Sequence, residues 1–288
     1  MKMADLGCII TAIVTPFDER LDIDEEAFVS LMQHLAASGS DGFVVAGTTG
    51  ETSTLTDDEQ IALVELAVAE RPPGVTIIAG AGSNDTRHAV HLTERMCELG
   101  VDAILSVTPY YNRPNRRGVV AHFTEVARAS SVPVVLYNIP QRTGTDMSND
   151  LLRQLGQIER LDYVKQSNPD NLASISGMRV YAGNDDLLAR TLDLEEAGGI
   201  LVASHLVGPQ MRRMFDEPLN RAAIDKSLRD VYETLGAVGN TAAVKAALEM
   251  LGHRAGGLRL PLVEVDPAER EAVREMLVRH RLLEPAAA

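Results

Sequence analysis

The sequence predicts a closed barrel of eight parallel β-strands with helical crossovers, a (β/α)8 TIM barrel, followed by a C-terminal helical domain. Eight short, apolar, β-branched runs alternate with longer segments of helical periodicity, which is the pattern of parallel strands joined by helices. The runs lack polar alternation, as expected for strands that are covered on both faces. No G-x-G-x-x-G follows the first run, which disfavours the competing open doubly wound sheet.

The predicted elements follow this alternation along the chain. The predicted strands are 9–14, 42–46, 75–79, 103–107, 132–137, 163–165, 180–182 and 200–203. Helical periodicity marks 56–70, 86–99 and 118–129 between them, and 220–235, 241–251 and 267–283 after them. We therefore expect a catalytic barrel over 1–217 and a helical domain over 218–288, with residues 284–288 frayed.

Composition excludes several classes of function. The 288 residues are 45% hydrophobic and 24% charged, as in ordinary soluble globular proteins. A net charge of −14 repels phosphate backbones and disfavours nucleic acid as a partner. No apolar run is long enough for a membrane span, and the N-terminus lacks the apolar region of a signal peptide, so we expect a cytoplasmic protein. Cys8 and Cys97 lack metal-ligand spacing, so we expect free thiols and no metal site.

Polar residues and glycines gather directly after the predicted strands. These clusters are 47–51, 80–84, 108–112, 137–142, 165 and 183–185. In a barrel the carboxyl ends of all the strands share one rim, which is where active sites are built. Packing alone does not explain six such clusters at one rim.

Lys165 is the candidate nucleophile at this rim. It is one of four lysines, against 23 arginines, and the only one in a strand pattern. Partial burial lowers the pKa of an amine, so that a neutral fraction can condense with a carbonyl. The alternative is a structural ion pair with Asp162 or another acid, and position alone leaves both interpretations open.

Other rim residues each have a functional and a structural interpretation. Thr48 and Thr49, between two glycines, form either a small carboxylate cradle or an ordinary turn that caps the next helix. Tyr111 and Tyr137 are either proton relays or tyrosines with core-facing rings. Arg142 either binds a second carboxylate or is a solvated loop arginine.

Taken together, these motifs resemble one family. The segments are GTTGE (47–51), GAGSNDT (80–86), VTPYYNRP (107–114), YNIPQRTG (137–144), Lys165, and VKAALEMLG with RLPL (244–262). They resemble the dihydrodipicolinate synthase/N-acetylneuraminate lyase family of pyruvate-dependent class I aldolases, in the same order over nearly the whole chain. The resemblance implies a (β/α)8 barrel with a C-terminal helical domain, usually a homotetramer built as a dimer of dimers, and no cofactor.

The resemblance also implies a role for each rim residue. Lys165 would form a Schiff base with pyruvate, and Thr49 would hold the pyruvate carboxylate. Thr48, Tyr111 and Tyr137 would form the proton relay, with Tyr111 entering from a neighbouring subunit. Further substrate contacts are implied at Arg142, which would receive L-aspartate 4-semialdehyde, and at Gly183 and the backbone near Leu201.

The implied reaction is condensation of these two substrates to 4-hydroxy-tetrahydrodipicolinate, in lysine and diaminopimelate biosynthesis. Arg142 and the paired tyrosines in VTPYY favour this synthase branch. The alternative is a 2-keto-3-deoxy sugar acid aldolase or dehydratase, or an N-acetylneuraminate lyase. The sequence departs from the usual pattern after the lysine, where it reads Lys165-Gln166-Ser167, and in GNDD at 183–186.

A regulatory expectation comes from the same resemblance. Feedback-inhibited members bind lysine through histidines after the GTTGE loop and a glutamate after the GAGSNDT stretch. Here those positions are Asp57, Gln60 and His88, although Asn84 and Tyr110 are kept. We therefore expect weak or absent inhibition by lysine, because the carboxylate that would pair its ammonium group is missing.

Overall fold

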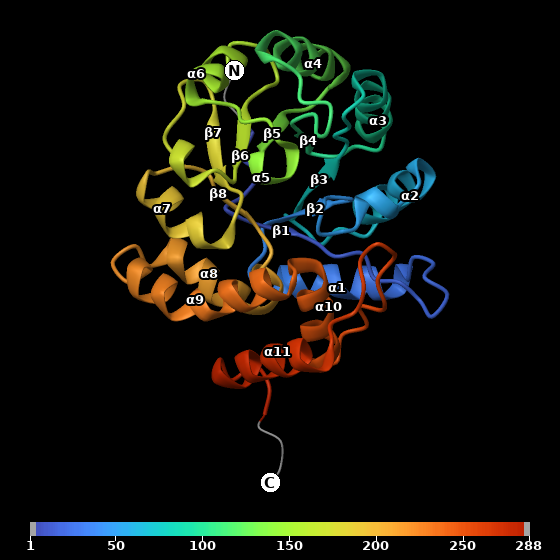
Figure 1. Ribbon diagram of the computed structural model, residues 1–288, viewed down its shortest axis with the longest axis vertical. Helices are drawn as coiled ribbons and strands as arrows, with labels where there is room; N and C mark the ends of the chain where they lie inside the picture. The colour runs from blue at the N-terminus through green and yellow to red at the C-terminus, as the bar shows by residue number, and fades with distance from the viewer. Residues whose placement is uncertain (1–3, 285–288) are drawn as a thin grey trace.

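A computed structural model describes residues 4–284 and shows eight parallel strands closed into a barrel in chain order, with β1 paired to β8 (Figure 1). The strands are β1 (Ile9–Ala12), β2 (Gly42–Val45), β3 (Thr76–Gly80), β4 (Ala103–Val107), β5 (Val134–Asn138), β6 (Tyr163–Gln166), β7 (Arg179–Ala182) and β8 (Gly198–Leu201). The predicted barrel is confirmed, with all eight strands at the expected places within a few residues.

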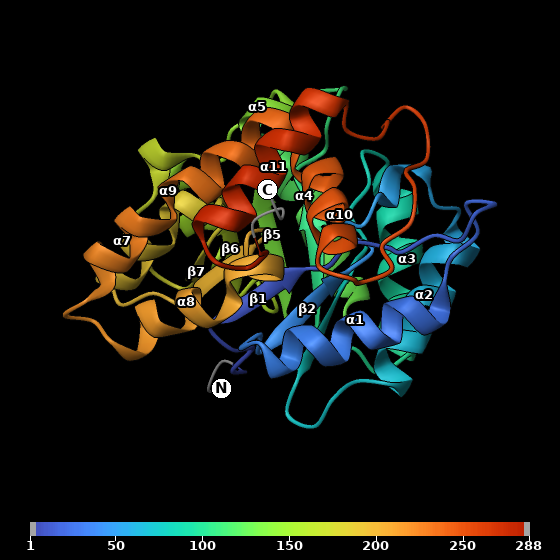
Figure 2. The same ribbon diagram turned by 90° about the horizontal axis from the view of Figure 1, so that it is seen from below.

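Helices surround the barrel. They are α1 (Glu25–Ala37), α2 (Asp57–Ala69), α3 (Thr86–Glu98), α4 (Arg116–Ala129), α5 (Pro140–Thr143), α6 (Asn149–Leu155), α7 (Leu188–Asp193), α8 (Ser204–Asp216), α9 (Arg221–Val238), α10 (Asn240–Met250) and α11 (Pro267–Arg279). Short 3-10 turns lie at η1 (Thr52–Thr54), η2 (Pro169–Asn171) and η3 (Asp185–Leu187). Helices α9, α10 and α11 pack on one another beside α8, on one side of the barrel (Figures 1 and 2).

The strands bury both faces, which explains their unbroken apolar character. One face of each strand contributes to an interior cluster that includes Ile10, Ile78 and Val135. The alternate residues, such as Ile9 and Val164, belong to the larger cluster between strands and helices. Because side chains alternate along a strand, Tyr163 in the interior places Lys165 on the same inward face, nearer the carboxyl end.

The largest departure from the predicted strands is at β8, which begins two residues before the predicted 200–203 and ends earlier. Gly199 pairs with Ile9 of β1. A Cβ at Gly198, whose φ is +135°, would lie 2.1 Å from the carbonyl oxygen of Cys8. Only glycine permits this close approach of two backbones, so the strand begins with residues that an apolar pattern does not identify.

Some predictions concern the chain ends and the cysteines. Cys8 and Cys97 are free thiols, as expected. Among residues 4–284, no helix is long and apolar enough to cross a membrane. The sequence predicts fraying of 284–288, and of these residues 285–288 lie outside the part of the chain that the structure describes.

Candidate active site

The carboxyl ends of the strands surround a cavity of about 60 Å³. It contains six of the eight residues predicted to bind substrate or to act in catalysis. Its lining residues are Ala12, Val44, Gly47, Thr48, Thr49, Leu105, Tyr137, Ile139, Arg142, Lys165, Gly183, Asn184, Val202, Asn240 and Thr241. Residues from most of the strand ends thus meet in one place, as the shared rim predicts.

Lys165 lies at the centre of this site. Its side chain is 6% exposed, and its Nζ lies 4.2 Å from the centroid of the Tyr137 ring. Lys165 and Tyr137 are register partners on β6 and β5, so the two strands fix this distance. Among residues 4–284, no ion pair within 4.0 Å involves Lys165, and the alternative interpretation of an ion pair with Asp162 is wrong. The amine is therefore buried beside an aromatic ring, with no acid of residues 4–284 within ion-pair distance.

The turn that carries Thr48 and Thr49 is held by its own backbone. The N–H of Glu51 donates to the Thr48 carbonyl at 3.1 Å, and the N–H of Thr52 donates to the Gly47 carbonyl at 3.2 Å. Helix α2 is capped by Thr56 together with Glu59, not by this turn. The helix-cap interpretation of the threonines is thus wrong, and both threonines line the cavity instead.

The candidate tyrosines differ in position. Tyr137 is 7% exposed and lines the cavity. Tyr111 is 90% exposed, with φ of +71°, and does not line the cavity of its own chain. Left-handed backbone at a tyrosine is uncommon and costs on the order of 1 kcal/mol or more. The structure thus places Tyr111 on the surface, outside the cavity of its own chain.

Of the two substrate-contact residues predicted at the ends of the seventh and eighth strands, only one lines the cavity. Gly183 lines the cavity, and a Cβ there would lie 2.1 Å from Ser167 Oγ. Leu201 is fully buried and does not line the cavity, whereas the next residue, Val202, does. Asn240 at the start of α10 was not predicted, because no local pattern links a C-terminal helix to the rim.

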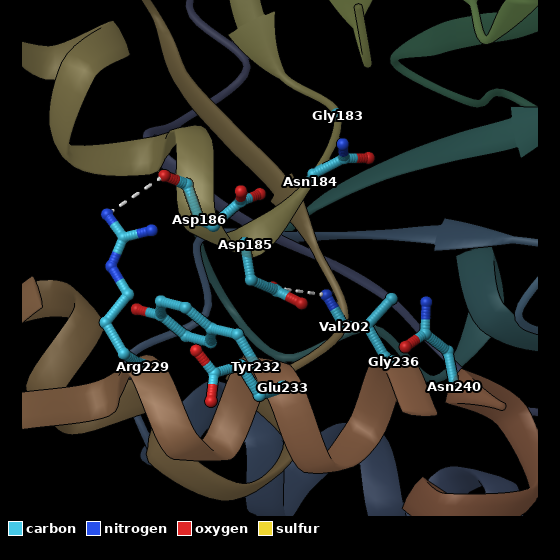
Figure 3. A pocket seen from close by; sticks show the side chains of 10 residues that line it. All are labelled: Gly183, Asn184, Asp185, Asp186, Val202, Arg229, Tyr232, Glu233, Gly236 and Asn240. Atoms are coloured by element: carbon cyan, nitrogen blue, oxygen red, sulfur yellow. Dashed lines mark hydrogen bonds between the residues drawn. The ribbon is translucent and has the colours of Figure 1, made fainter. Parts of the chain in front are cut away.

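A second cavity of about 340 Å³ adjoins the first (Figure 3). The two share Gly183, Asn184, Val202 and Asn240. In Figure 3 Asp185 points toward the Val202 N–H, which donates to its carboxylate at 2.9 Å, and the N–H of Ala203 donates at 3.0 Å. Burial raises the pKa of Asp185 to about 6, against the opposing effect of these donors and of the Lys165 charge. Asp185 therefore fixes the turn after β8.

A third cavity of about 410 Å³ shares Thr48, Ile139 and Arg142 with the first. It contains Asp57 and His88, whose Nε2 lies 3.0 Å from both carboxylate oxygens. No carboxylate stands at position 88, where the resemblance would place the glutamate, but Asp57 brings one into the same cavity. That carboxylate is already paired with the imidazole.

Comparisons with known proteins show which proteins this chain resembles. The model of the dihydrodipicolinate synthetase family matches residues 5–280. The chain is 39% identical to 4-hydroxy-tetrahydrodipicolinate synthase 1 of Halalkalibacterium halodurans, over 92% of this chain and 94% of the relative. It is also 39% identical to 4-hydroxy-tetrahydrodipicolinate synthase of Heliobacterium modesticaldum, over 95% of each.

Solved structures show the same likeness. A crystal structure of DHDPS from Cyanidioschyzon merolae with lysine bound superposes with a TM-score of 0.94 at 35% identity, covering 98% of this chain and 100% of that one. Dihydrodipicolinate synthase from Acinetobacter baumannii complexed with pyruvate has a TM-score of 0.93 at 31% identity, covering 96% and 100%.

Proposed function

The chain belongs to the dihydrodipicolinate synthetase family, and from this premise we propose how its rim residues carry out the reaction. The activity is that of a 4-hydroxy-tetrahydrodipicolinate synthase, which condenses pyruvate with L-aspartate 4-semialdehyde in lysine and diaminopimelate biosynthesis. The observation that carries the proposal is the buried Lys165 amine, with no acid within ion-pair distance among residues 4–284.

Lys165 is proposed to form the covalent intermediate. Its neutral amine adds to the C2 carbonyl of pyruvate, and loss of water leaves an iminium ion. The iminium withdraws electrons from C3, which loses a proton to give an enamine. The enamine carbon then bonds to the aldehyde carbon of the semialdehyde. Attack of the semialdehyde's amine on C2 closes the ring and releases Lys165.

The pyruvate carboxylate is assigned to the Thr48–Thr49 turn. Thr49 offers a hydroxyl and an N–H group in the cavity, in a turn whose backbone is already closed. Groups fixed before binding need no reorganisation when the charge arrives, which is how a small anion site gains affinity. Gly183 and the backbone near Leu201 complete the pyruvate site in this proposal, with Val202 as the residue of that turn that lines the cavity.

Proton transfer is assigned to Tyr137, Thr48 and Tyr111. Tyr137 lines the cavity and its ring lies beside the Lys165 amine, so we assign its phenol the proton transfers of carbinolamine dehydration and release. The exposure of Tyr111 is consistent with its reaching a neighbouring subunit. We propose on this basis a homotetramer built as a dimer of dimers, in which one chain completes the relay of the next.

Arg142 is assigned to the second substrate. It is exposed in α5, and it lines both the Lys165 cavity and the cavity that contains His88. A guanidinium there can bind the carboxylate of the semialdehyde bidentately.

We propose further that 1–217 form the catalytic barrel and 218–288 a helical domain. The cytoplasmic location stays a prediction.

The test is reductive trapping. Borohydride in the presence of pyruvate should add the reduced substrate to Lys165, located by peptide mass spectrometry. The Lys165→Ala variant should give no adduct, whereas Lys226→Ala, which removes an exposed lysine of α9, should trap like the wild type. Pyruvate is then paired with the semialdehyde, and cleavage of sialic and keto-deoxy sugar acids is assayed. Folded protein without an adduct, or turnover of sugar acids alone, would contradict the proposal.

A further inference from the structure

Glu51 connects the substrate turn to the C-terminal region of the chain. It follows Thr49 by two residues, and its N–H closes the turn on the Thr48 carbonyl. Its φ of +60° is left-handed, which an L residue adopts only when its surroundings compensate the strain. The residue is 1% exposed, so its carboxylate lies inside the protein. A charge placed there requires specific partners.

Both oxygens of this carboxylate face residues from beyond the barrel. Lys245 of α10 places its Nζ 2.7 Å from Oε1 and donates a hydrogen bond to the Gly257 carbonyl at 2.7 Å. The Lys245 side chain is 3% exposed, and burial lowers its pKa despite the Glu51 charge. The N–H of Arg259 donates to Oε2 at 3.0 Å, across 208 positions of sequence.

The Arg259 side chain extends this connection to the rest of the rim. Its guanidinium donates to both oxygens of Glu59, at 2.6 and 3.0 Å, and Glu59 also caps α2. It further donates to the Leu21 and Thr54 carbonyls. The Phe17 ring lies under both cations, 4.2 Å from Lys245 Nζ and 4.6 Å from the Arg259 guanidinium carbon.

A buried charge pair contributes little net stability, because desolvation offsets most of the attraction. Its attraction depends on the distance between the charges, however, so displacing one partner leaves the other buried charge uncompensated. This pair joins the turn of Thr48 and Thr49 to α10, whose first residues Asn240 and Thr241 line the same cavity. The contacts therefore link the position of the turn to that of α10 across the cavity that holds Lys165.

We propose that Lys245 and Arg259 are positioning residues that hold the Thr48–Thr49 turn, through Glu51, in the orientation that binds the carboxylate of pyruvate. This inference rests on the proposed function of the turn. Neither cation touches the substrate cavity itself. The helical C-terminal region thus contributes to the affinity for the first substrate.

The experiment measures the pyruvate concentration that gives half-maximal borohydride trapping at Lys165, which needs no aldehyde. The main variant is Glu51→Gln combined with Lys245→Met, which removes both charges and nearly preserves both volumes. Arg212→Met is the matched control, because it removes a partly buried cation paired with Asp41 at the opposite, amino-terminal ends of the strands. Thermal melting reports folding of each variant, and KM for the semialdehyde is measured separately.

The double variant should need about ten- to a hundredfold more pyruvate, as expected for a misplaced binding group, with a smaller change in KM for the semialdehyde. The control should melt lower without this shift. Adding Thr49→Val should produce less than the sum of the two effects, because both act through one turn. Additive effects would overturn the positioning role. So would a folded double variant in which the pyruvate concentration for half-maximal trapping is unchanged.

Two further outcomes separate the proposals. If the wild type fails to trap pyruvate, the proposed function fails, whatever the variants do. If the double variant does not fold, Arg259→Lys decides, because it keeps the charge and the backbone bond to Glu51 but loses the paired contacts to Glu59. If Arg259→Lys needs a higher pyruvate concentration for half-maximal trapping, the inference is supported, and an unchanged concentration contradicts it.

Discussion

Removal of one oxygen atom from Tyr137 should separate catalysis from stability. The Tyr137→Phe substitution keeps the ring that lies 4.2 Å from Lys165 Nζ and keeps the burial of that ring. Within residues 4–284, the hydrogen bonds of Tyr137 to loop groups run through its backbone carbonyl, which accepts from Thr108. Loss of the hydroxyl therefore breaks no contact that supports the fold.

The expected magnitudes follow from this geometry. The unfolding free energy should change by no more than about 0.5 kcal/mol, as for a substitution outside the stabilising contacts. Loss of a general acid–base group should lower kcat by about 10²- to 10⁴-fold, or about 3–5 kcal/mol of activation free energy. Borohydride should still trap some pyruvate on Lys165, because the amine and the carboxylate site remain.

The assay combines kcat, urea unfolding and mass spectrometry of the trapped adduct. Tyr181→Phe is the matched control, since this buried tyrosine also faces the barrel interior but donates to the Gly7 carbonyl at 2.8 Å. It should lose about 1 kcal/mol of stability with little change in kcat. Turnover near the wild-type value in Tyr137→Phe would refute the relay role, and a large loss of stability would refute the structural reasoning.

Three further predictions concern the second substrate, regulation and pH. Arg142→Met should raise KM for the semialdehyde about 10- to 100-fold through loss of a charge-assisted pair, with KM for pyruvate unchanged in steady-state kinetics. Lysine should inhibit weakly or not at all in initial-rate assays, because His88 already pairs the carboxylate of Asp57; inhibition at sub-millimolar lysine would contradict this. Burial lowers the pKa of His205 to about 4, below its unfolded value of 6.5, so the unfolded chain binds more protons and stability is lost as pH falls through this range. Between pH 7 and pH 4, the unfolding free energy measured with urea should fall by on the order of 3 kcal/mol more in the wild type than in His205→Gln. An equal dependence of the unfolding free energy on pH in both proteins would count against this prediction.

The residues near each strand end could be predicted because their signals are local. A run of β-branched residues followed by glycine and polar residues indicates both the strand and the rim, so Lys165 and the Thr48–Thr49 turn were found without tertiary information. Position alone left the role of Lys165 undecided between Schiff base and ion pair. The structure excluded the ion pair, because no acid among residues 4–284 lies within ion-pair distance of the Lys165 amine on β6.

Residues that join distant segments could not be predicted in this way. Leu201 was expected near pyruvate, but the turn after β8 points Val202 into the cavity, because Asp185 binds the N–H groups of Val202 and Ala203. Asn240 lines the cavity from a helix that carries no rim signal of its own. A side chain's direction at a turn depends on such long-range partners, which no short sequence pattern contains.

The sequence by itself determined the order of strands and the family, and it marked Lys165 as the candidate nucleophile, because hydrophobic periodicity and motif spacing are encoded within a few residues. Tertiary structure alone decided which atoms meet. The Glu51 carboxylate finds its partners at Lys245 and Arg259, about two hundred positions away, only after the barrel has closed and the C-terminal helices have packed beside it. The position of these partners is important because a charge that is buried away from water must have its partner in place.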